Sequence, residues 1–217
     1  MRKIFNIPHF TDNELIYGDT YDGYPLMRDK GPFVRKHLDK IIRVMDASLD
    51  EHPRTLAFRV DLRLPRGLQY FNENRLIERF ISSFKAKVQH ARVAAKRNNP
   101  KAHDTSVRYV CAREVGQRGV PHYHLVIFVN RDAFNCLGRY ELGRSNLYTR
   151  LVEAWASALR IRPDTAIGLV EIPKNAKYQI TADDFDSQDE LFYRASYMAK
   201  AATKLRGSRH CFSSSKR

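Results

Sequence analysis

The segment that most constrains the fold runs from residue 55 to residue 65. From Phe58 onward its apolar and polar residues alternate strictly. Side chains two apart in a strand share a face, so this alternation is typical of a strand with one apolar face and one polar face. The apolar set is Phe58, Val60, Leu62 and Leu64, and the polar set is Arg59, Asp61 and Arg63.

The segments around this strand predict the order of the other elements. Apolar residues at helical spacing indicate helices over residues 33–49, 74–96 and 146–159. The capping-box pattern Ser187-Gln188-Asp189-Glu190 opens a further helix that continues to about residue 204. Further strands are predicted over residues 107–114 and 122–130, with weaker ones over 168–172 and near Tyr178. The order β-α-β-β-α-β-α predicts an α+β fold, an antiparallel sheet of ferredoxin-like or RRM-like type flanked by helices.

Turn signals and charge divide the chain into three parts. Residues 1–52 are expected to form an N-terminal arm and an accessory amphipathic helix, because residues 1–32 are rich in turn residues. Residues 53–206 hold the predicted sheet, and residues 207–217 form a basic C-terminal tail. The start of the sequence lacks the apolar stretch of a secretory signal, so we expect a cytoplasmic protein.

Charge and composition narrow the partners. Lys and Arg number 38 against 24 Asp and Glu, which gives a net charge of +14. This surplus favours a polyanion, nucleic acid before an acidic membrane surface. Runs of about 18 apolar residues are absent, so no transmembrane helix is expected. The three cysteines provide neither a disulfide framework nor a metal knuckle, and the sequence contains no P-loop or zinc-finger motif.

A pair of histidines opens the strand over residues 122–130. His122 and His124 are two apart, so both imidazoles should project from the same face. If the loop of residues 115–121 closes a hairpin, Glu114 lies opposite His122 and on that same face. One carboxylate and two imidazoles can share a divalent cation. A one-residue change of register would send Glu114 to the other face.

A second constellation lies on the helix that follows Ser187. Tyr193, Tyr197, Lys200 and Lys204 group on one helix face, opposite the apolar stripe. Two phenols beside lysines suit nucleophilic attack on a phosphate, because the cations stabilise an ionised phenol. Lys200 is equally consistent with a solvated lysine at a helix C-terminus.

These two motifs together resemble the HUH endonuclease superfamily. Pro121-His122-Tyr123-His124 before an apolar strand, followed by Tyr193-x-x-x-Tyr197-x-x-Lys200, is similar to the gene-II-type replication initiators of inoviruses (filamentous phages) and their prophage relatives. The stretches 59–65, 107–110, 119–124 and 191–194 are similar in order and spacing, and the resemblance covers roughly residues 55–205.

The resemblance implies an HUH fold and a metal-dependent nickase. Such an enzyme cleaves one DNA strand at a replication origin through a 5′-phosphotyrosine link and starts rolling-circle replication. It would use Tyr197 and Tyr193 as nucleophiles, Lys200 as an assisting cation, and Glu114, His122 and His124 around Mg²⁺ or Mn²⁺. Its partners would be single-stranded or cruciform origin DNA and the helicase and polymerase of a bacterial host. Basic residues expected to contact the DNA are Arg59, Arg63, Arg113, Arg118, Arg194 and Lys204.

Two other interpretations remain open. The basic helices and aromatic residues are also consistent with a non-catalytic protein that binds single-stranded nucleic acid or controls replication. Independently of function, an exposed charged strand face explains Arg59 and Arg63 as well as contact with the DNA backbone does. A two-histidine phosphoesterase would use His9-Phe10-Thr11 and His103-Asp104-Thr105, but both tripeptides run into polar residues rather than an apolar strand.

Overall fold

The computed structural model describes residues 14–65, 74–115, 120–203 and 211–216. Its main element in those ranges is a six-stranded antiparallel sheet with the order β10-β6-β7-β5-β8, in which β9 also pairs with β5. The predicted α+β class and antiparallel sheet are confirmed. The strands are β5 (Arg54–Arg63), β6 (Arg108–Val115), β7 (Pro121–Asn130), β8 (Val170–Glu171), β9 (Lys177–Thr181) and β10 (Phe212–Ser214).

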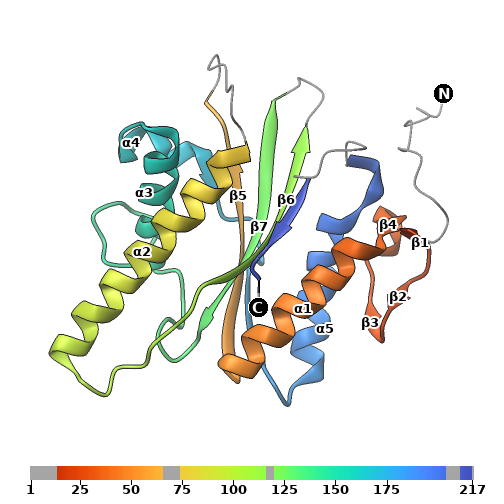
Figure 1. The fold of residues 1–217 in the computed structure, drawn as a ribbon, viewed down its shortest axis with the longest axis horizontal. Helices are drawn as coiled ribbons and strands as arrows, with labels where there is room; N and C mark the ends of the chain where they lie inside the picture. Colours follow the sequence, from red (N-terminus) through yellow and green to blue (C-terminus); the bar gives the residue numbers. More distant parts are fainter. Residues whose placement is uncertain (1–13, 66–73, 116–119, 204–210, 217) are drawn as a thin grey trace.

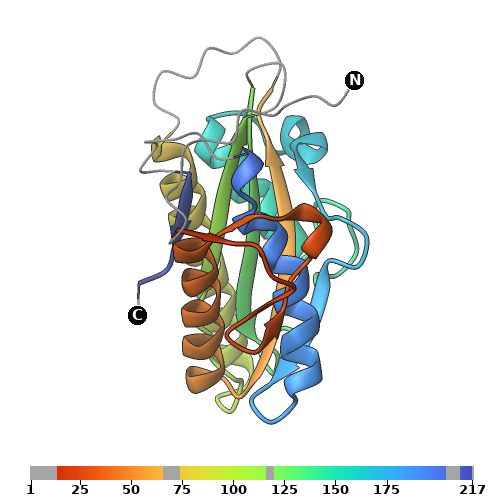
Figure 2. The same ribbon diagram turned by 90° about the vertical axis from the view of Figure 1, so that its right-hand side faces the viewer.

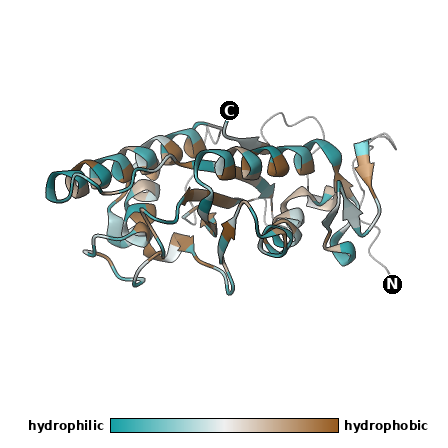
Figure 3. Cartoon of the chain, turned by 90° about the horizontal axis from the view of Figure 1, so that it is seen from below, coloured by the Kyte–Doolittle hydropathy of each residue, from teal (hydrophilic) through white to brown (hydrophobic). Residues whose placement is uncertain are grey.

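Helices cover both faces of this sheet (Figure 1). One face carries α2 (Asn74–Asn98), α3 (Leu147–Leu159) and the short α4 (Pro163–Ala166). The other face carries α1 (Arg35–Glu51) and α5 (Phe185–Ser196). Figure 3 shows the apolar stripes of the long helices turned toward the sheet and their hydrophilic stripes turned outward. In the described ranges, no helix is long and apolar enough to cross a membrane.

The strand patterns follow from this layering. In β5 the apolar set, including Phe58 and Val60, packs under α2 and α3. The polar set of β5 lies on the face of α1 and α5. Strand β7 lies between β5 and β6 and is buried on both faces, which explains its continuous apolar run over residues 125–129.

The segment of residues 14–34 packs against α5 through β3 (Tyr24–Pro25), as Figure 2 shows. It forms the pair β1 (Leu15–Ile16) and β4 (Phe33–Val34), the hairpin of β2 (Thr20–Tyr21) and β3, and the 3₁₀ turn Arg28–Lys30. The Tyr24 and Phe192 rings lie 4.7 Å apart, and Phe33 is fully buried in the core shared by α1 and α5. From the predicted tail, residues 212–214 add the edge strand β10 to β6.

The helix predicted to reach residue 204 is shorter than expected. It ends at Ser196, and the 3₁₀ turns Tyr197–Ala199 and Ala201–Thr203 follow on either side of Lys200. Lys200 leaves the helical conformation, with φ −54° and ψ 133°, and forms a β-bridge to Phe33, so its backbone pairs with the segment before α1 instead of continuing the helix. The N-cap is Asp184 rather than Ser187, because the Asp184 side chain accepts a hydrogen bond from the Ser187 N–H.

The strand predicted over residues 168–172 is also shorter than expected. Only Val170 and Glu171 pair with β5, and a 3₁₀ turn occupies Ile167–Leu169 before them. Strands β8 and β9 lie one after the other along the same edge of β5. This edge is therefore shared between two short strands, which local sequence pattern does not specify.

Candidate active site

The hairpin of β6 and β7 has the register that the sequence predicts. Glu114 lies opposite His122, and Ala112 lies opposite His124. The Glu114 Oε2 atom is 3.7 Å from His122 Nε2 and 3.5 Å from His124 Nε2. One ligand atom from each of the three residues lies within 4.8 Å of the others, so the structure brings the predicted set together. We call Glu114, His122 and His124 the metal cluster.

Burial differs across the metal cluster. Glu114 is 4% exposed and His124 is 7% exposed, whereas the His122 side chain keeps 32% of its surface accessible. The two imidazole rings meet edge to face, with centroids 4.9 Å apart. The cluster is therefore closed toward the sheet and open to solvent at His122.

Asp61 orients one of the histidines, a contact that local sequence pattern does not predict. The pairing of β5 with β7 places Asp61 opposite His124. Asp61 Oδ1 is 2.8 Å from His124 Nδ1, and Arg59 donates two hydrogen bonds of 3.0 Å to the same carboxylate. Arg59 Nη2 is also 3.0 Å from Nδ1. We assign the Nδ1 proton to the bond with Asp61, because a charged acceptor is the closer of the two neighbours.

This assignment makes the cluster suitable for a divalent cation. With Nδ1–H bound to Asp61, the Nε2 lone pair of His124 points into the cluster beside Glu114. A carboxylate and two neutral imidazoles form a donor set that binds divalent metals. The residues thus fit a divalent cation, and these donors alone do not distinguish Mg²⁺ from Mn²⁺.

The protonation of His124 and the protonation of Asp61 depend on one another. Burial opposes the charged form of His124, but hydrogen bonds to Asp61 and Glu114 outweigh it and raise the pKa of the imidazole above its ordinary value. Burial likewise disfavours the Asp61 carboxylate, yet hydrogen bonds from His124 and Arg59 lower its pKa overall. A proton and a metal ion therefore compete for the same imidazole nitrogen, His124 Nε2.

Tyr197 and Lys200 reach the metal cluster from the 3₁₀ turn after α5. The Tyr197 ring lies edge-on to His124, with centroids 6.0 Å apart. Lys200 Nζ is 3.7 Å from the centre of the Tyr197 ring and 3.3 Å from Glu114 Oε2. Lys200 is 8% exposed, so it is a buried cation bound to a metal-cluster carboxylate rather than a solvated lysine. The guanidinium of Arg59 lies 5.4 Å from the same tyrosine ring.

Tyr193 is placed differently from Tyr197. It lies one turn earlier on α5 and is 36% exposed. Among the described residues, the ring contacts with the metal cluster come from Tyr197 and do not include Tyr193. Of the two tyrosines, Tyr197 is therefore the one whose ring contacts a histidine of the metal cluster.

The predicted DNA-contacting residues occupy varied positions. Arg59 is held by Asp61, and Arg63 forms an ion pair with Glu171 on β8. Arg113 is half-buried on β6, and Arg194 is exposed on α5. Arg118 and Lys204 lie outside the described residues, as does the tripeptide starting at His9. His103 lies in an exposed loop away from the metal cluster.

Comparison with known proteins places the chain among relatives from one bacterium. A family model described as the YagK/YfjJ C-terminal domain matches residues 17–215. The protein named "uncharacterized protein YfjJ" of Escherichia coli (strain K12) is 34% identical over 201 residues, which cover 87% of this chain and 94% of that protein. "Uncharacterized protein YagK" of the same strain is 29% identical over 188 residues, covering 82% and 90%. No solved structure matches.

Proposed function

We propose that this chain, which belongs to the YagK/YfjJ C-terminal domain family, is a metal-dependent DNA nickase and strand transferase of the HUH type. The observation that carries the proposal is the position of Tyr197, edge-on to His124 and in contact with Lys200. A phenol, a buried cation and a two-histidine, one-carboxylate set within a few ångströms are the groups that phosphoryl transfer to tyrosine requires.

Each residue has a distinct part in the proposed reaction. Glu114, His122 and His124 would hold the divalent cation, which supplies Lewis-acid stabilisation of charge on the scissile phosphate. Lys200 stabilises negative charge on the Tyr197 oxygen, because its ammonium group lies against that ring. Asp61 keeps the His124 ring in place, and Arg59 links Asp61 to the tyrosine.

The chemistry exchanges one phosphodiester bond for another. The Tyr197 oxygen bonds to phosphorus while the bond to the 3′-oxygen breaks, which leaves a 5′-phosphotyrosine and a free 3′-hydroxyl. The phenol loses one proton and the 3′-oxygen gains one, so the exchange needs no nucleotide cofactor. Tyr193, one turn away and exposed, would accept the second strand end after a local rearrangement.

The proposed setting follows from this chemistry. The substrate is single-stranded or cruciform DNA at a replication origin, and the enzyme starts rolling-circle replication in the bacterial cytoplasm with a host helicase and polymerase. The net charge of +14 supports a nucleic-acid substrate. The alternative, a non-catalytic single-strand-binding or replication-control protein, would bind the same DNA without cutting it.

A covalent-adduct assay separates the two functions. Purified protein is incubated with supercoiled plasmid and with single-stranded oligonucleotides in Mg²⁺, Mn²⁺ or EDTA, and adducts are mapped by mass spectrometry. We expect a metal-dependent adduct on Tyr197 that is lost in Tyr197→Phe, because only the nucleophilic oxygen is removed. Tyr193→Phe should retain the first cleavage and impair strand transfer.

The matched control for this assay is Tyr140→Phe. Tyr140 is 51% exposed and packs against Tyr148 on α3, on the opposite face of the sheet. This variant should form the adduct at the wild-type yield. Adduct formation at the wild-type yield by the Tyr193→Phe/Tyr197→Phe double variant would show that the nucleophile lies elsewhere, and metal-independent binding without cleavage would favour the non-catalytic function.

A further inference from the structure

A basic pocket lies between α1 and the C-terminal strand β10, away from the metal cluster. Its volume is about 450 Å³. Lys40 and Arg43 of α1, Arg108 of β6 and Lys216 line it together with Ser214 and Ser215. Among the described residues that form its wall, none is a carboxylate. The lining therefore favours an anionic ligand.

For three of the four cations that line the pocket, no carboxylate of the described wall balances the charge. Arg108 is bound by Glu51 through hydrogen bonds of 3.2 and 2.8 Å, so its charge is balanced. Lys40 donates to the Phe212 carbonyl at 3.0 Å, and Arg43 donates to the Asp39 carbonyl at 3.4 Å. Neutral carbonyl acceptors fix these side chains without removing their charge. Lys216 is exposed at the mouth of the pocket.

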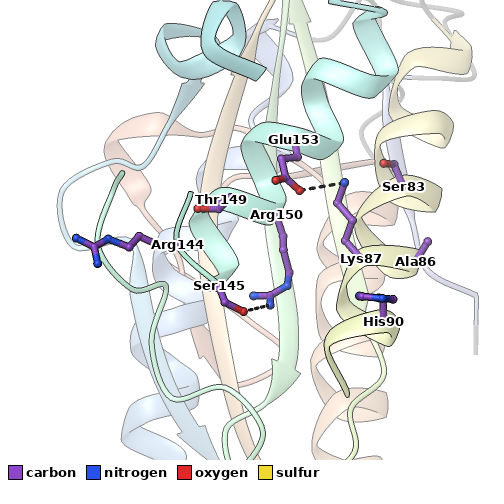
Figure 4. A pocket seen from close by; sticks show the side chains of 9 residues that line it. All are labelled: Ser83, Ala86, Lys87, His90, Arg144, Ser145, Thr149, Arg150 and Glu153. Atoms are coloured by element: carbon purple, nitrogen blue, oxygen red, sulfur yellow. Dashed lines mark hydrogen bonds and ion pairs between the residues drawn. The ribbon is translucent and has the colours of Figure 1, made fainter. Parts of the chain in front are cut away.

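The pocket between α2 and α3 shows the contrast (Figure 4). There, Lys87 Nζ pairs with Glu153 at 3.0 Å, and Arg144 pairs with Glu141 at 3.2 Å. Two of its three Lys and Arg side chains are thus paired with carboxylates, whereas Arg150 donates to the neutral Ser145 hydroxyl at 3.0 Å. Its volume of about 490 Å³ is similar to that of the basic pocket. It lies on the face of the sheet opposite α1. The two pockets are therefore similar in size, and they differ in that the Glu153 carboxylate lies in the wall of this pocket while the basic pocket has none among its described lining residues.

A stripe of cations connects the basic pocket to the candidate active site. Lys36, Lys40 and Arg43 are spaced i, i+4 and i+7, so they share one face of α1. Phe33, just before α1, forms the β-bridge to Lys200 of the active site. The N-terminal end of α1 thus lies next to the segment that carries Lys200. The stripe extends from Lys36 to the pocket, a length of about 10 Å along the helix.

Strand β6, which lies beneath α1, also extends from the metal cluster to the basic pocket. Arg108 and Glu114 lie six residues apart at opposite ends of β6 and on the same face. Six strand residues span about 20 Å. The short strand β10 contacts both α1 and β6. Val110 and Ala112, which lie between Arg108 and Glu114 on this face, are buried beneath α1, so a strand of DNA bound at the metal cluster would follow the cations of α1 toward Lys216.

We infer that Lys36, Lys40, Arg43 and Lys216 form a phosphate track that binds the backbone of a single DNA strand extending from Tyr197. The inference rests on the proposed function, because it assigns the track to the strand that Tyr197 cleaves. The contacts are to phosphates, so the track adds affinity and register rather than base specificity. Substrates long enough to cover both the metal cluster and the pocket bind more tightly than short ones.

The test measures binding of fluorescein-labelled oligonucleotides by anisotropy across a series of salt concentrations, in EDTA. Single strands of about 6 and 20 nucleotides are compared, and the variant is Arg43→Gln/Lys216→Gln, which changes two exposed side chains. We expect the salt slope for the long strand to fall in magnitude by about 1.4, or about 0.7 for each lost phosphate contact. The affinity at low salt should fall by about 10-fold. The short strand should change much less.

The control variant is Lys87→Gln/Arg144→Gln, which removes the same charge from the pocket of Figure 4. It should leave the salt slope unchanged. An equal fall in slope for both variants would overturn the track, since net charge would then explain the loss. The phosphate track would also be overturned if millimolar inorganic phosphate displaced the long strand from the unmodified chain. The pocket would then be a site for free phosphate. Binding in EDTA requires neither metal nor cleavage. A failure of the chain to nick DNA can therefore be distinguished from a failure of the track to bind DNA.

Discussion

At the scale of single residues, Asp61 connects the metal cluster to the tyrosine. Its carboxylate binds His124 Nδ1 at 2.8 Å and receives two hydrogen bonds from Arg59, which in turn lies over the Tyr197 ring. Ligands of a metal are commonly oriented by such partners. Asp61 is therefore a positioning residue, because it acts on the site through His124 and Arg59.

We expect Asp61→Asn to weaken binding of Mn²⁺ by about 10- to 100-fold. The amide lacks the negative charge that holds the Nδ1 proton of His124, so the ring loses its fixed orientation. Isothermal titration calorimetry with Mn²⁺ measures the change. Asp132→Asn is the control, because Asp132 pairs with Arg54 at the other end of β5 and should leave the affinity unchanged. Equal affinities of the two variants for Mn²⁺ would show that Asp61 does not position the metal cluster.

Local spacing was sufficient for the residues that are close in sequence. The period of two placed His122 and His124 together, and the short hairpin placed Glu114 opposite His122. Asp61 is far from His124 in sequence and reaches it only through the pairing of β5 with β7. That register depends on the whole sheet, so the polar face of β5 indicated charge on one side without indicating which histidine it meets.

At the scale of elements, α5 shows where helical periodicity misleads. The pattern predicted one helix that carries Tyr193, Tyr197 and Lys200 on a single face, whereas the helix ends at Ser196. Lys200 still reaches the site because its backbone bridges Phe33 and because Ala201 N–H donates to the Pro32 carbonyl at 2.8 Å. Contacts with a segment distant in sequence thus replace the last turns of the predicted helix.

The start of α5 gives a test at this scale. Asp184→Ala should lower the free energy of unfolding by about 1 kcal/mol, because the Asp184 side chain caps the Ser187 N–H. Ser187→Ala should cost less, since the half-buried Ser187 side chain donates to the Asp184 carbonyl and caps no helix N–H. Urea denaturation followed by circular dichroism compares the two. A larger loss for Ser187→Ala would support the predicted capping box instead.

At the scale of the whole molecule, the segments at the two ends of the sequence complete one face of the sheet. The sequence was sufficient to predict an antiparallel sheet flanked by helices, because strand alternation and helix periodicity are local signals. It did not indicate that α1 and α5 share a core opposite α2 and α3, or that residues 212–214 form an edge strand on β6. Which face a helix covers depends on chain topology, and a three-residue strand has too few residues to show alternation.

Removal of residues 1–52 tests how far the sheet depends on α1. Leu38, Ile41 and Met45 are fully buried against the sheet and α5, and their loss uncovers Val126 and Phe128. Each such side chain contributes about 1.5–3 kcal/mol of burial, so the loss approaches a whole domain's net stability of about 5–15 kcal/mol. We expect the shortened chain to bind the dye ANS and to lack a cooperative thermal transition.

Two single variants calibrate that result. Ile41→Ala should remain folded and lose about 2–5 kcal/mol, because it removes part of one buried side chain. Asp50→Ala changes an exposed residue of α1 and should alter stability by less than about 0.5 kcal/mol. Differential scanning calorimetry on all three chains gives the comparison. If the shortened chain unfolds cooperatively within a few degrees of the full chain, α1 is an accessory helix, and residues 53–217 carry a self-sufficient core beneath Tyr197 and the metal cluster.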